Sequence, residues 1–184
     1  SMSFDELIDR TGTKSARWRG RGDTLALTVG DSDFRLPPPV RDALIKRLDE
    51  GVVGYDGVPD SLRELIIDRM LRLYDWQIKD EWLVFLSGVV PGFNFCCRGL
   101  TSPGDAIISE TPIYYPFLSA PSNADRALSP LPALLQSGRW SMDLDGLAKL
   151  AAEPRNKLLL FCNPQNPLGR VSTRDELLAM ADIC

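Results

Sequence analysis

The sequence contains no histidine and only four cysteines, Cys96, Cys97, Cys162 and Cys184. No pair of these cysteines has the C-x-x-C spacing that zinc sites and redox motifs use. Without histidine, a zinc site of the usual kind would need all four cysteines at spacings that do not suit one tetrahedral ion. We therefore expect no metal site, and we interpret the cysteines as reduced core residues of a cytosolic protein.

Charge and hydropathy argue against a nucleic-acid-binding protein and against a membrane-spanning one. The net charge is −4 and the basic residues are scattered, so we expect no nucleic-acid partner. No apolar run approaches the roughly 20 residues that span a bilayer, and the start, SMSFDELIDR, is too polar and acidic for a leader peptide. With 184 residues, 44% hydrophobic and 25% charged, the chain is typical of a globular protein, which we expect to be cytoplasmic.

The first half of the chain predicts an extended arm followed by two helices. Residues 24–34, TLALTVGDSDF, are typical of an extended segment, and the prolines at 36–39 favour the first turn of a helix. Apolar residues then recur at helical spacing up to Gly51. A glycine-rich loop follows at 51–60 and leads into a second amphipathic helix. The apolar face of that helix consists of Leu62, Leu65, Ile66, Met70 and Leu73.

Short apolar runs from residue 82 onward predict buried strands. The runs at 82–86, 105–110 and 157–162 are nearly continuous, as in parallel strands that are covered on both faces. A weaker strand is predicted at 126–131. These segments alternate with others that suit helices, so we expect an α/β fold with a mainly parallel sheet and covering helices.

The expected helices of this region lie at 89–101, 114–121 and 143–152. A last helix begins at a capping box, with Ser172 or Thr173 as the N-cap and an acidic residue three positions later. Every strand is thus followed by a helix-forming segment, as βαβ units require.

Ligands of open parallel sheets bind at the carboxyl ends of the strands. Ser87 and Gly88 follow the expected strand at 82–86 and lead into a helix, where free N–H groups favour an anion. Strand–helix turns also contain Ser-Gly for reasons of geometry alone. Tyr114 and Tyr115 follow the next strand, where an aromatic ring either stacks on a flat ligand or packs at a domain seam.

The stretch FCNPQNPLGR at 161–170 follows the last expected strand. Each proline favours an extended conformation of the preceding asparagine, Asn163 or Asn166. A side-chain amide at such a place can donate to an oxyanion or a phenolic oxygen. A plain turn would not need two such asparagines, so we interpret this loop as functional. The loop GYDGVPD at 54–60 is equally consistent with a simple hinge.

The motifs LSGVV, TPIYYPF and CNPQNPLG, in this order and each after an expected strand, closely resemble the fold-type I enzymes that use pyridoxal 5′-phosphate (PLP), the class I/II aminotransferases and their relatives. The segments GDSDF and GYDG resemble the cystathionine β-lyase, or C–S lyase, branch. The resemblance spans about residues 4 to 184. It implies an N-terminal arm and small-domain segment at 1–50, and the first part of the PLP-binding large domain at 51–184.

The resemblance also implies roles for individual residues. The backbone amides of Val89 and Val90, next to Gly88, would bind the cofactor phosphate. Tyr114 would stack on the pyridine ring. Asn166 would hydrogen-bond the cofactor 3′-oxygen and help to hold the carboxylate of a small amino-acid substrate. Together they would line one cleft at the carboxyl ends of the strands.

Two further positions match the family in the first half of the chain. Tyr55 corresponds to a tyrosine that crosses a dimer interface to the phosphate in the partner subunit, so a homodimer is implied. Gly30 corresponds to the segment that lies over the substrate.

The catalytic lysine of the family, which binds the cofactor covalently, has no counterpart here. Nor do the aspartate that pairs with the pyridine nitrogen and the arginine that clamps the substrate carboxylate. We therefore expect the N-terminal portion of an enzyme that is inactive by itself and holds PLP weakly, with apolar strand edges left unpaired. The five lysines, none of which matches the family motif, are Lys14, Lys46, Lys79, Lys149 and Lys157.

Two alternatives to a C–S lyase remain open. Transamination uses the same scaffold and every motif that is present in this chain. The chain could also be a non-catalytic scaffold that acts as a binding or dimerisation module.

Overall fold

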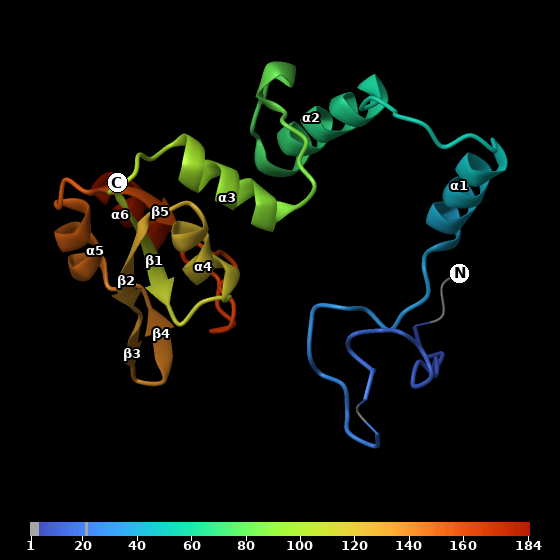
Figure 1. Cartoon of the computed structure of the whole chain (residues 1–184), viewed down its shortest axis with the longest axis horizontal. Coiled ribbons are helices and arrows are strands. Elements are labelled where there is room, and N and C mark those ends of the chain that lie inside the picture. The colour runs from blue at the N-terminus through green and yellow to red at the C-terminus, as the bar shows by residue number, and fades with distance from the viewer. Residues whose placement is uncertain (1–3, 21) are drawn as a thin grey trace. The chain divides into compact units, whose positions relative to one another are not determined.

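The computed structural model describes residues 4–20 and 22–184 and divides the chain into two compact units, Ser1–Trp76 and Gln77–Cys184 (Figure 1). Each unit is described by itself. The expected division at residue 50 concerns the domains of a complete enzyme, and it stays a prediction.

The first unit consists of an irregular arm and two helices, α1 (Pro38–Asp49) and α2 (Asp60–Tyr74). Proline in the first turn of α1 has the backbone angle that a helix needs and lacks only an N–H that would have no partner there. Gly51, with φ +76°, follows the end of α1 in a conformation that favours glycine. Both helices predicted from the sequence are confirmed.

The second unit contains a three-stranded parallel sheet in the order β2-β1-β5 and a separate hairpin of β3 and β4 (Figure 1). Pro130 and Pro132 lie in β2, which is an edge strand, and an edge tolerates the missing N–H donors. In chain order the elements are η1 (Asp80–Trp82), α3 (Val89–Gly99), β1 (Ala106–Thr111), α4 (Pro116–Asn123), β2 (Ala127–Pro132), β3 (Leu134–Gln136), β4 (Arg139–Ser141), α5 (Leu144–Ala151), β5 (Asn156–Leu160) and α6 (Arg174–Ile183).

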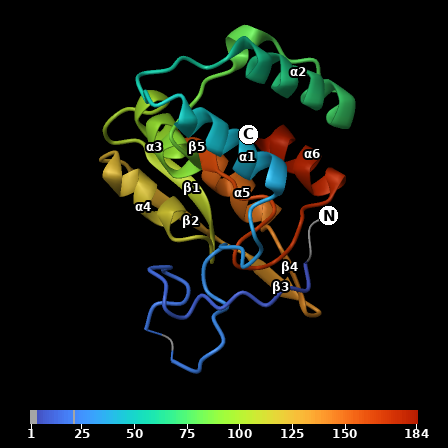
Figure 2. The same cartoon turned by 90° about the vertical axis from the view of Figure 1, so that its right-hand side faces the viewer.

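Helices cover both faces of the parallel sheet. Alternation along β1 sends Ile107 to the face covered by α3 and α4, and Ile108 to the face covered by α5 and α6. β5 alternates in the same way, with Leu158 and Leu160 on the first face and Leu159 on the second. Figure 2 shows α4 and α6 on opposite sides of the strands. The expected α/β architecture with covering helices is therefore confirmed for this unit.

The expected strand at 82–86 is wrong. In the described part of the chain, the short helix η1 ends at Trp82 and residues 83–87 belong to no strand. Leu83 is extended, with φ −83° and ψ 112°, but an extended segment becomes a strand only when a neighbour completes its ladder of hydrogen bonds. Val84 of this segment is 76% exposed.

The cysteines correct a second expectation. All four are free thiols, and Cys97 lies in the core with a pKa that burial raises. Cys96 and Cys184 are exposed, so the interpretation of all four as core residues is wrong. Cys96 and Cys97 are consecutive residues of α3, so their side chains point in directions about 100° apart, and only Cys97 reaches the core.

Candidate functional site

Gly88 is the N-cap of α3 and has φ 140° and ψ 166°, a conformation that is essentially restricted to glycine. The N–H of Gly92 donates to the carbonyl of Gly88 at 3.1 Å, and Pro91 has no N–H. No side chain of the described residues caps this helix. The free donors of the first turn are therefore the amides of Val89 and Val90, and the helix dipole favours an anion beside them.

Tyr114 follows β1 in the short connection to α4. Ile113 beside it is buried in the core, whereas Tyr114 is 39% exposed. The ring of Tyr114 contacts that of Tyr115, with centroids 5.2 Å apart at an angle of 65°. Pro116 then begins α4, two residues later than the start expected from the sequence. Tyr114 thus has an accessible ring and lies directly after a residue that is buried in the core.

The loop after β5 contains both Asn-Pro pairs. The backbone of Gln165 closes it, because its N–H donates to the carbonyl of Arg170 at 2.8 Å and its carbonyl accepts from the N–H of Gly169 at 2.9 Å. Gly169 has φ +67°, where glycine is favoured. The oxygen Oδ1 of Asn163 accepts from the N–H of Ser172 at 3.0 Å, so this asparagine stabilises the turn.

Asn166 differs from Asn163 in its surroundings. Its side chain is exposed, and within residues 4–20 and 22–184 no hydrogen-bond partner for its amide is found. The amide is therefore free to bind a ligand through both its donor and its acceptor.

The loops that carry Tyr114 and Asn166 are joined by a hydrogen bond. Nε2 of Gln165 donates to the carbonyl oxygen of Pro112 at 2.8 Å, and Pro112 lies two residues before Tyr114. Because β1 and β5 are parallel neighbours, both loops leave the same end of the sheet.

The amino end of α3 lies toward this end of the sheet as well. Arg126, which immediately precedes β2, donates from Nη2 to the carbonyl of Thr101 at 2.7 Å, so the carboxyl end of α3 lies near the start of β2. Toward the other end, Phe93 packs on Phe117 in the first turn of α4, with centroids 4.7 Å apart. The amides of Val89 and Val90 therefore belong to the same end of the second unit as Tyr114 and Asn166.

A buried carboxylate lies beneath the two joined loops. Glu110 of β1 is only 5% exposed, and its Oε2 lies 3.4 Å from Nε2 of Gln165. Burial raises the pKa of Glu110, and the nearby charge of Glu176 adds to this, while Gln165 and Arg170 lower it. Glu176 is also partly desolvated, but the N–H of Thr173 and the guanidinium of Arg170 hold its pKa below the usual value.

The remaining predicted residues, Tyr55 and Gly30, belong to the first unit. Tyr55 is fully exposed. Gly30 lies in a bend where an added Cβ would meet no atom within 4 Å. Their contributions to a shared site stay predictions.

Two groups of residues around these positions escaped the sequence analysis. One is the pair formed by Gln165 and Glu110. The position of Gln165 between the two Asn-Pro pairs could have indicated that its side chain matters in this loop. The other lies near Gly30 in the first unit: Arg10 binds Asp31 and Asp33 at 2.8 Å each, and Nε1 of Trp18 donates to Asp33 at 2.9 Å. The aspartates of GDSDF and the arginines upstream of them could have predicted this network of ion pairs.

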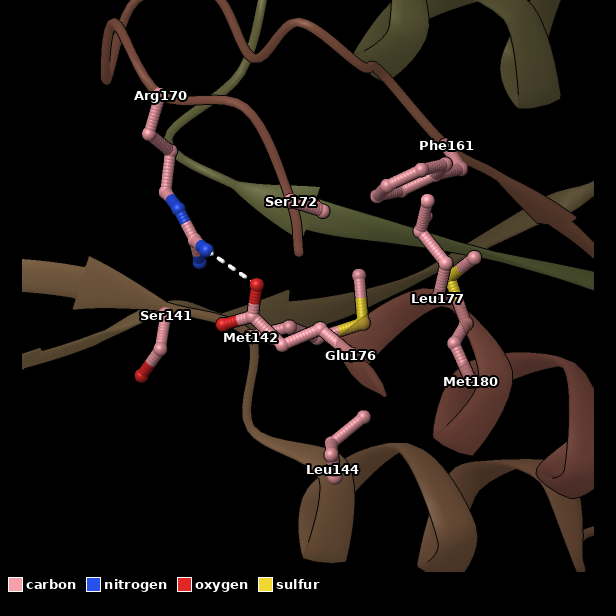
Figure 3. Close-up of a pocket in the computed structure, with 9 residues that line it drawn as sticks. All are labelled: Ser141, Met142, Leu144, Phe161, Arg170, Ser172, Glu176, Leu177 and Met180. Carbon is pink, nitrogen blue, oxygen red and sulfur yellow. Dashed lines mark hydrogen bonds and ion pairs between the residues drawn. The ribbon is translucent and has the colours of Figure 1, made fainter. Parts of the chain in front are cut away.

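A cavity of about 210 Å³ lies beside the loop that follows β5, on the face of the sheet covered by α5 and α6. Figure 3 shows the ion pair of Arg170 and Glu176 at one end and apolar side chains at the other. None of the described residues that line it is a predicted site residue. Its lining consists of Ser141, Met142, Leu144, Phe161, Arg170, Ser172, Glu176, Leu177 and Met180.

Within residues 4–20 and 22–184, no helix has the length and apolar character to span a membrane. Nor do three or more histidine, cysteine, aspartate or glutamate side chains gather there as a metal site would require.

Free backbone amides at the start of α3, the accessible ring of Tyr114 and the free amide of Asn166 thus lie toward the carboxyl end of a parallel sheet. The sequence matches the family "Aminotransferase class I and II" over residues 22–184, and the chain belongs to that family.

The relatives include C–S lyases and aminotransferases. Cystathionine beta-lyase PatB of Bacillus subtilis is 31% identical over 100% of this chain and 49% of its own length. The crystal structure of cystalysin from Treponema denticola, which contains PLP, has a TM-score of 0.92 and 35% identity over 100% of this chain and 48% of that one. A PLP-bound putative aminotransferase from Clostridium difficile 630 has a TM-score of 0.91 and 36% identity over 100% and 49%. The chain thus spans about half the length of these relatives.

Proposed function

We propose that this chain is the N-terminal portion of a PLP-dependent enzyme that cleaves the C–S bond of cystathionine or a related cysteine S-conjugate by β-elimination. The observation that carries the proposal is the set of unused hydrogen-bonding groups at one end of the sheet. The amides of Val89 and Val90 and the side chain of Asn166 are free there, at the same end as the ring of Tyr114. These groups fit the phosphate, the phenolic oxygen and the ring of PLP.

Each residue would contribute a part of the binding. The two amides at the start of α3 would hold the dianionic phosphate, assisted by the helix dipole. Tyr114 would cover one face of the ring and exclude water from it. Asn166 would donate to the cofactor 3′-oxygen and orient the substrate carboxylate. When bound, PLP supplies the electron sink that makes loss of the substrate α-proton feasible.

The proposal extends to the assembly and the location of the whole protein. Tyr55 would reach the phosphate of the partner subunit in a homodimer, and Gly30 would lie in the segment over the substrate. The protein would work in the cytoplasm. The full exposure of Tyr55 supports the first of these points, since an unpacked tyrosine is available to another chain.

This chain by itself is proposed to be inactive. No lysine of the chain matches the family motif for covalent attachment of PLP, and the carboxylate partner of the pyridine nitrogen is also missing. A charge-assisted bond of that kind contributes about 1.5–3 kcal/mol, so its loss alone would weaken PLP binding by roughly one to two orders of magnitude.

The experiment uses two preparations, this chain ending at Cys184 and a protein that continues through the family's lysine. Each is mixed with PLP and dialysed, and the retained cofactor absorbance is measured. Pyruvate and thiol release from cystathionine is then assayed. We expect the longer protein to retain PLP and release both products, and this chain to do neither.

Other outcomes would decide between the alternatives. The similarity to a putative aminotransferase favours transamination as the second candidate, which predicts a keto acid and no thiol. Turnover by the chain ending at Cys184 would overturn the half-enzyme proposal. If the longer protein also fails to retain PLP, a binding or dimerisation module becomes the better account.

A further inference from the structure

The side chain of Gln165 makes hydrogen bonds to Glu110, Pro112 and Leu168 beside the candidate site, and the proposed function gives it no role. It is 5% exposed. Its Nε2 donates to the carbonyl of Pro112 at 2.8 Å, and its Oε1 accepts from the N–H of Leu168 at 2.8 Å. One side chain therefore bridges two loops and also closes a turn within its own loop.

The amide can take only one orientation here. Pro112 and Glu110 offer acceptors on one side, and the N–H of Leu168 is a donor on the other. Exchanging the amide oxygen and nitrogen would set oxygen against oxygen and N–H against N–H. The side chain of Gln165 is thus locked by its surroundings, and its backbone is locked by two further hydrogen bonds to Gly169 and Arg170.

Its place in the chain makes this lock relevant to ligand binding. Gln165 directly precedes Asn166, and the carbonyl that it binds lies two residues before Tyr114. We infer that Gln165 is a positioning residue, whose hydrogen bond to Pro112 sets the separation of Asn166 and Tyr114 and so preorganises the PLP site. This inference rests on the proposed function.

The network also anchors the loop to α6. The carbonyl of Arg170 accepts from the N–H of Gln165, while its guanidinium pairs with Glu176. Glu176 in turn accepts from the N–H of Thr173 at 2.7 Å. The loop that follows β5 is therefore also bonded to Glu110 of β1 and to Glu176 of α6. Replacement of Gln165 is expected to loosen this loop rather than to unfold α6.

The test uses ¹⁵N-labelled chain and three variants. Gln165→Met keeps the shape and removes every side-chain hydrogen bond. Gln165→Glu keeps the acceptor for Leu168 and, when ionised, loses the donor to Pro112. Gln136→Met is the matched control, because Gln136 is an exposed glutamine of β3 in the same unit.

The first readout needs no ligand. Both Gln165 variants are expected to shift the amide signals of Ile113, Tyr114 and Tyr115 across the loop-to-loop hydrogen bond, and Gln136→Met is expected to leave them in place. If Gln165→Met leaves these three signals unchanged, or if Gln165→Glu matches the wild type, the bridge to Pro112 does not couple the loops and the inference is overturned.

The second readout is a titration with PLP up to millimolar concentration, followed through the amide signals of Val89, Val90 and Tyr114. A looser loop lowers the fraction of chains in which the loop is placed to bind PLP, and the apparent affinity for PLP falls with that fraction. We expect Gln165→Met to bind about tenfold more weakly than wild type and Gln136→Met to bind equally well. The titration is made at a temperature where urea unfolding shows each variant to be folded, so that a loss of stability alone would not alter the result.

The two proposals fail in different ways. Equal PLP affinities for Gln165→Met and Gln136→Met overturn the positioning role and leave the proposed function intact. A wild-type chain whose Val89, Val90 and Tyr114 signals do not respond to PLP overturns the positioning role even where the ligand-free spectra show coupled loops, whereas the proposed function fails only if the longer protein does not retain PLP.

Discussion

The two units of the chain are stabilised in different ways. Of residues 4–20 and 22–76, Ala26 is the only one that is buried, and neither α1 nor α2 has a buried side chain. The second unit contains two apolar clusters, one on each face of its sheet. Hydrophobic burial is the main favourable contribution to folding, so it is concentrated after residue 76.

The first unit relies on charged groups instead. Arg10 pairs with Asp31 and Asp33, and Arg17 lies 3.5 Å from Asp33. Exposed ion pairs contribute little stability individually. The apolar faces of its helices, with Leu48 65% exposed, resemble surfaces that another part of an enzyme would cover. We therefore expect the second unit to fold by itself and the first to need more than its own contacts.

The largest expected effect contrasts a leucine of each unit. Leu147 of α5 is fully buried among Ile108 and Leu131. Leu147→Ala should lower the free energy of unfolding by about 2–5 kcal/mol, through lost burial and the cavity left behind. The exposed Leu48 of α1 is the matched control, and Leu48→Ala should change it by less than about 0.5 kcal/mol. Urea unfolding measures both, and similar losses would refute the contrast.

The next effect contrasts the two glycines predicted to belong to the site. Gly88 has φ 140°, and strain at such a backbone costs about 1–3 kcal/mol for a residue with a side chain. Gly88→Ala should therefore destabilise the second unit by about that amount, although the added Cβ would meet Pro91 only at an ordinary 3.6 Å. Gly30 has neither a positive φ nor a close neighbour, so Gly30→Ala should leave stability almost unchanged in the same measurement.

The predictable parts of the fold were those with local signals. Continuous apolar runs predicted β1 and β5, and helical spacing with capping residues predicted α5 and α6. The hairpin of β3 and β4 was missed, because its strands have three residues each. Its turn has positive φ at both Ser137 and Gly138, and Ser-Gly is a weaker hairpin signal than Asn-Gly.

The expected strand at 82–86 failed for a different reason. Its sequence is as apolar as that of β1, but pairing depends on strands that are distant along the chain, and a local pattern does not contain that information. The same limit applies to the candidate site. Motifs and resemblance predicted roles for Tyr114 and Asn166, whereas the role inferred for Gln165 depends on a hydrogen bond between two loops that are distant in the sequence.

A smaller effect is expected at the helix starts. The hydroxyl of Thr173 accepts from the N–H of Glu176, and the Glu176 carboxylate accepts from the N–H of Thr173. Thr173→Ala removes half of this capping box and should cost about 1 kcal/mol. The helices of the first unit begin at prolines without side-chain caps. Thr24→Ala, at an exposed position of the arm, serves as the control and should have almost no effect on urea unfolding.

The smallest and most selective effect is a pH response of opposite sign in the two units. A hydrogen bond from Arg10 lowers the pKa of Asp31, and one from Trp18 lowers that of Asp33, both from 3.8. A carboxyl whose pKa is lower in the folded state stabilises that state above its unfolded pKa and loses this contribution as the pH falls through the folded pKa. The network of the first unit should therefore weaken below about pH 3.8.

Glu110 gives the second unit the opposite response. Burial raises its pKa from 4.5, so its contribution to stability is complete below pH 4.5 and is lost as the pH rises through its higher folded pKa. The indole N–H signals of Trp18 in the arm and Trp140 in β4 report the two units separately during urea unfolding between pH 3 and 7. Glu110→Gln should remove the decline in stability that the Trp140 signal reports above pH 4.5. It should leave unchanged the loss of stability at acid pH that the Trp18 signal reports. A decline of the same size in this variant would mean that another group governs the second unit, since the substituted amide has no charge to bury.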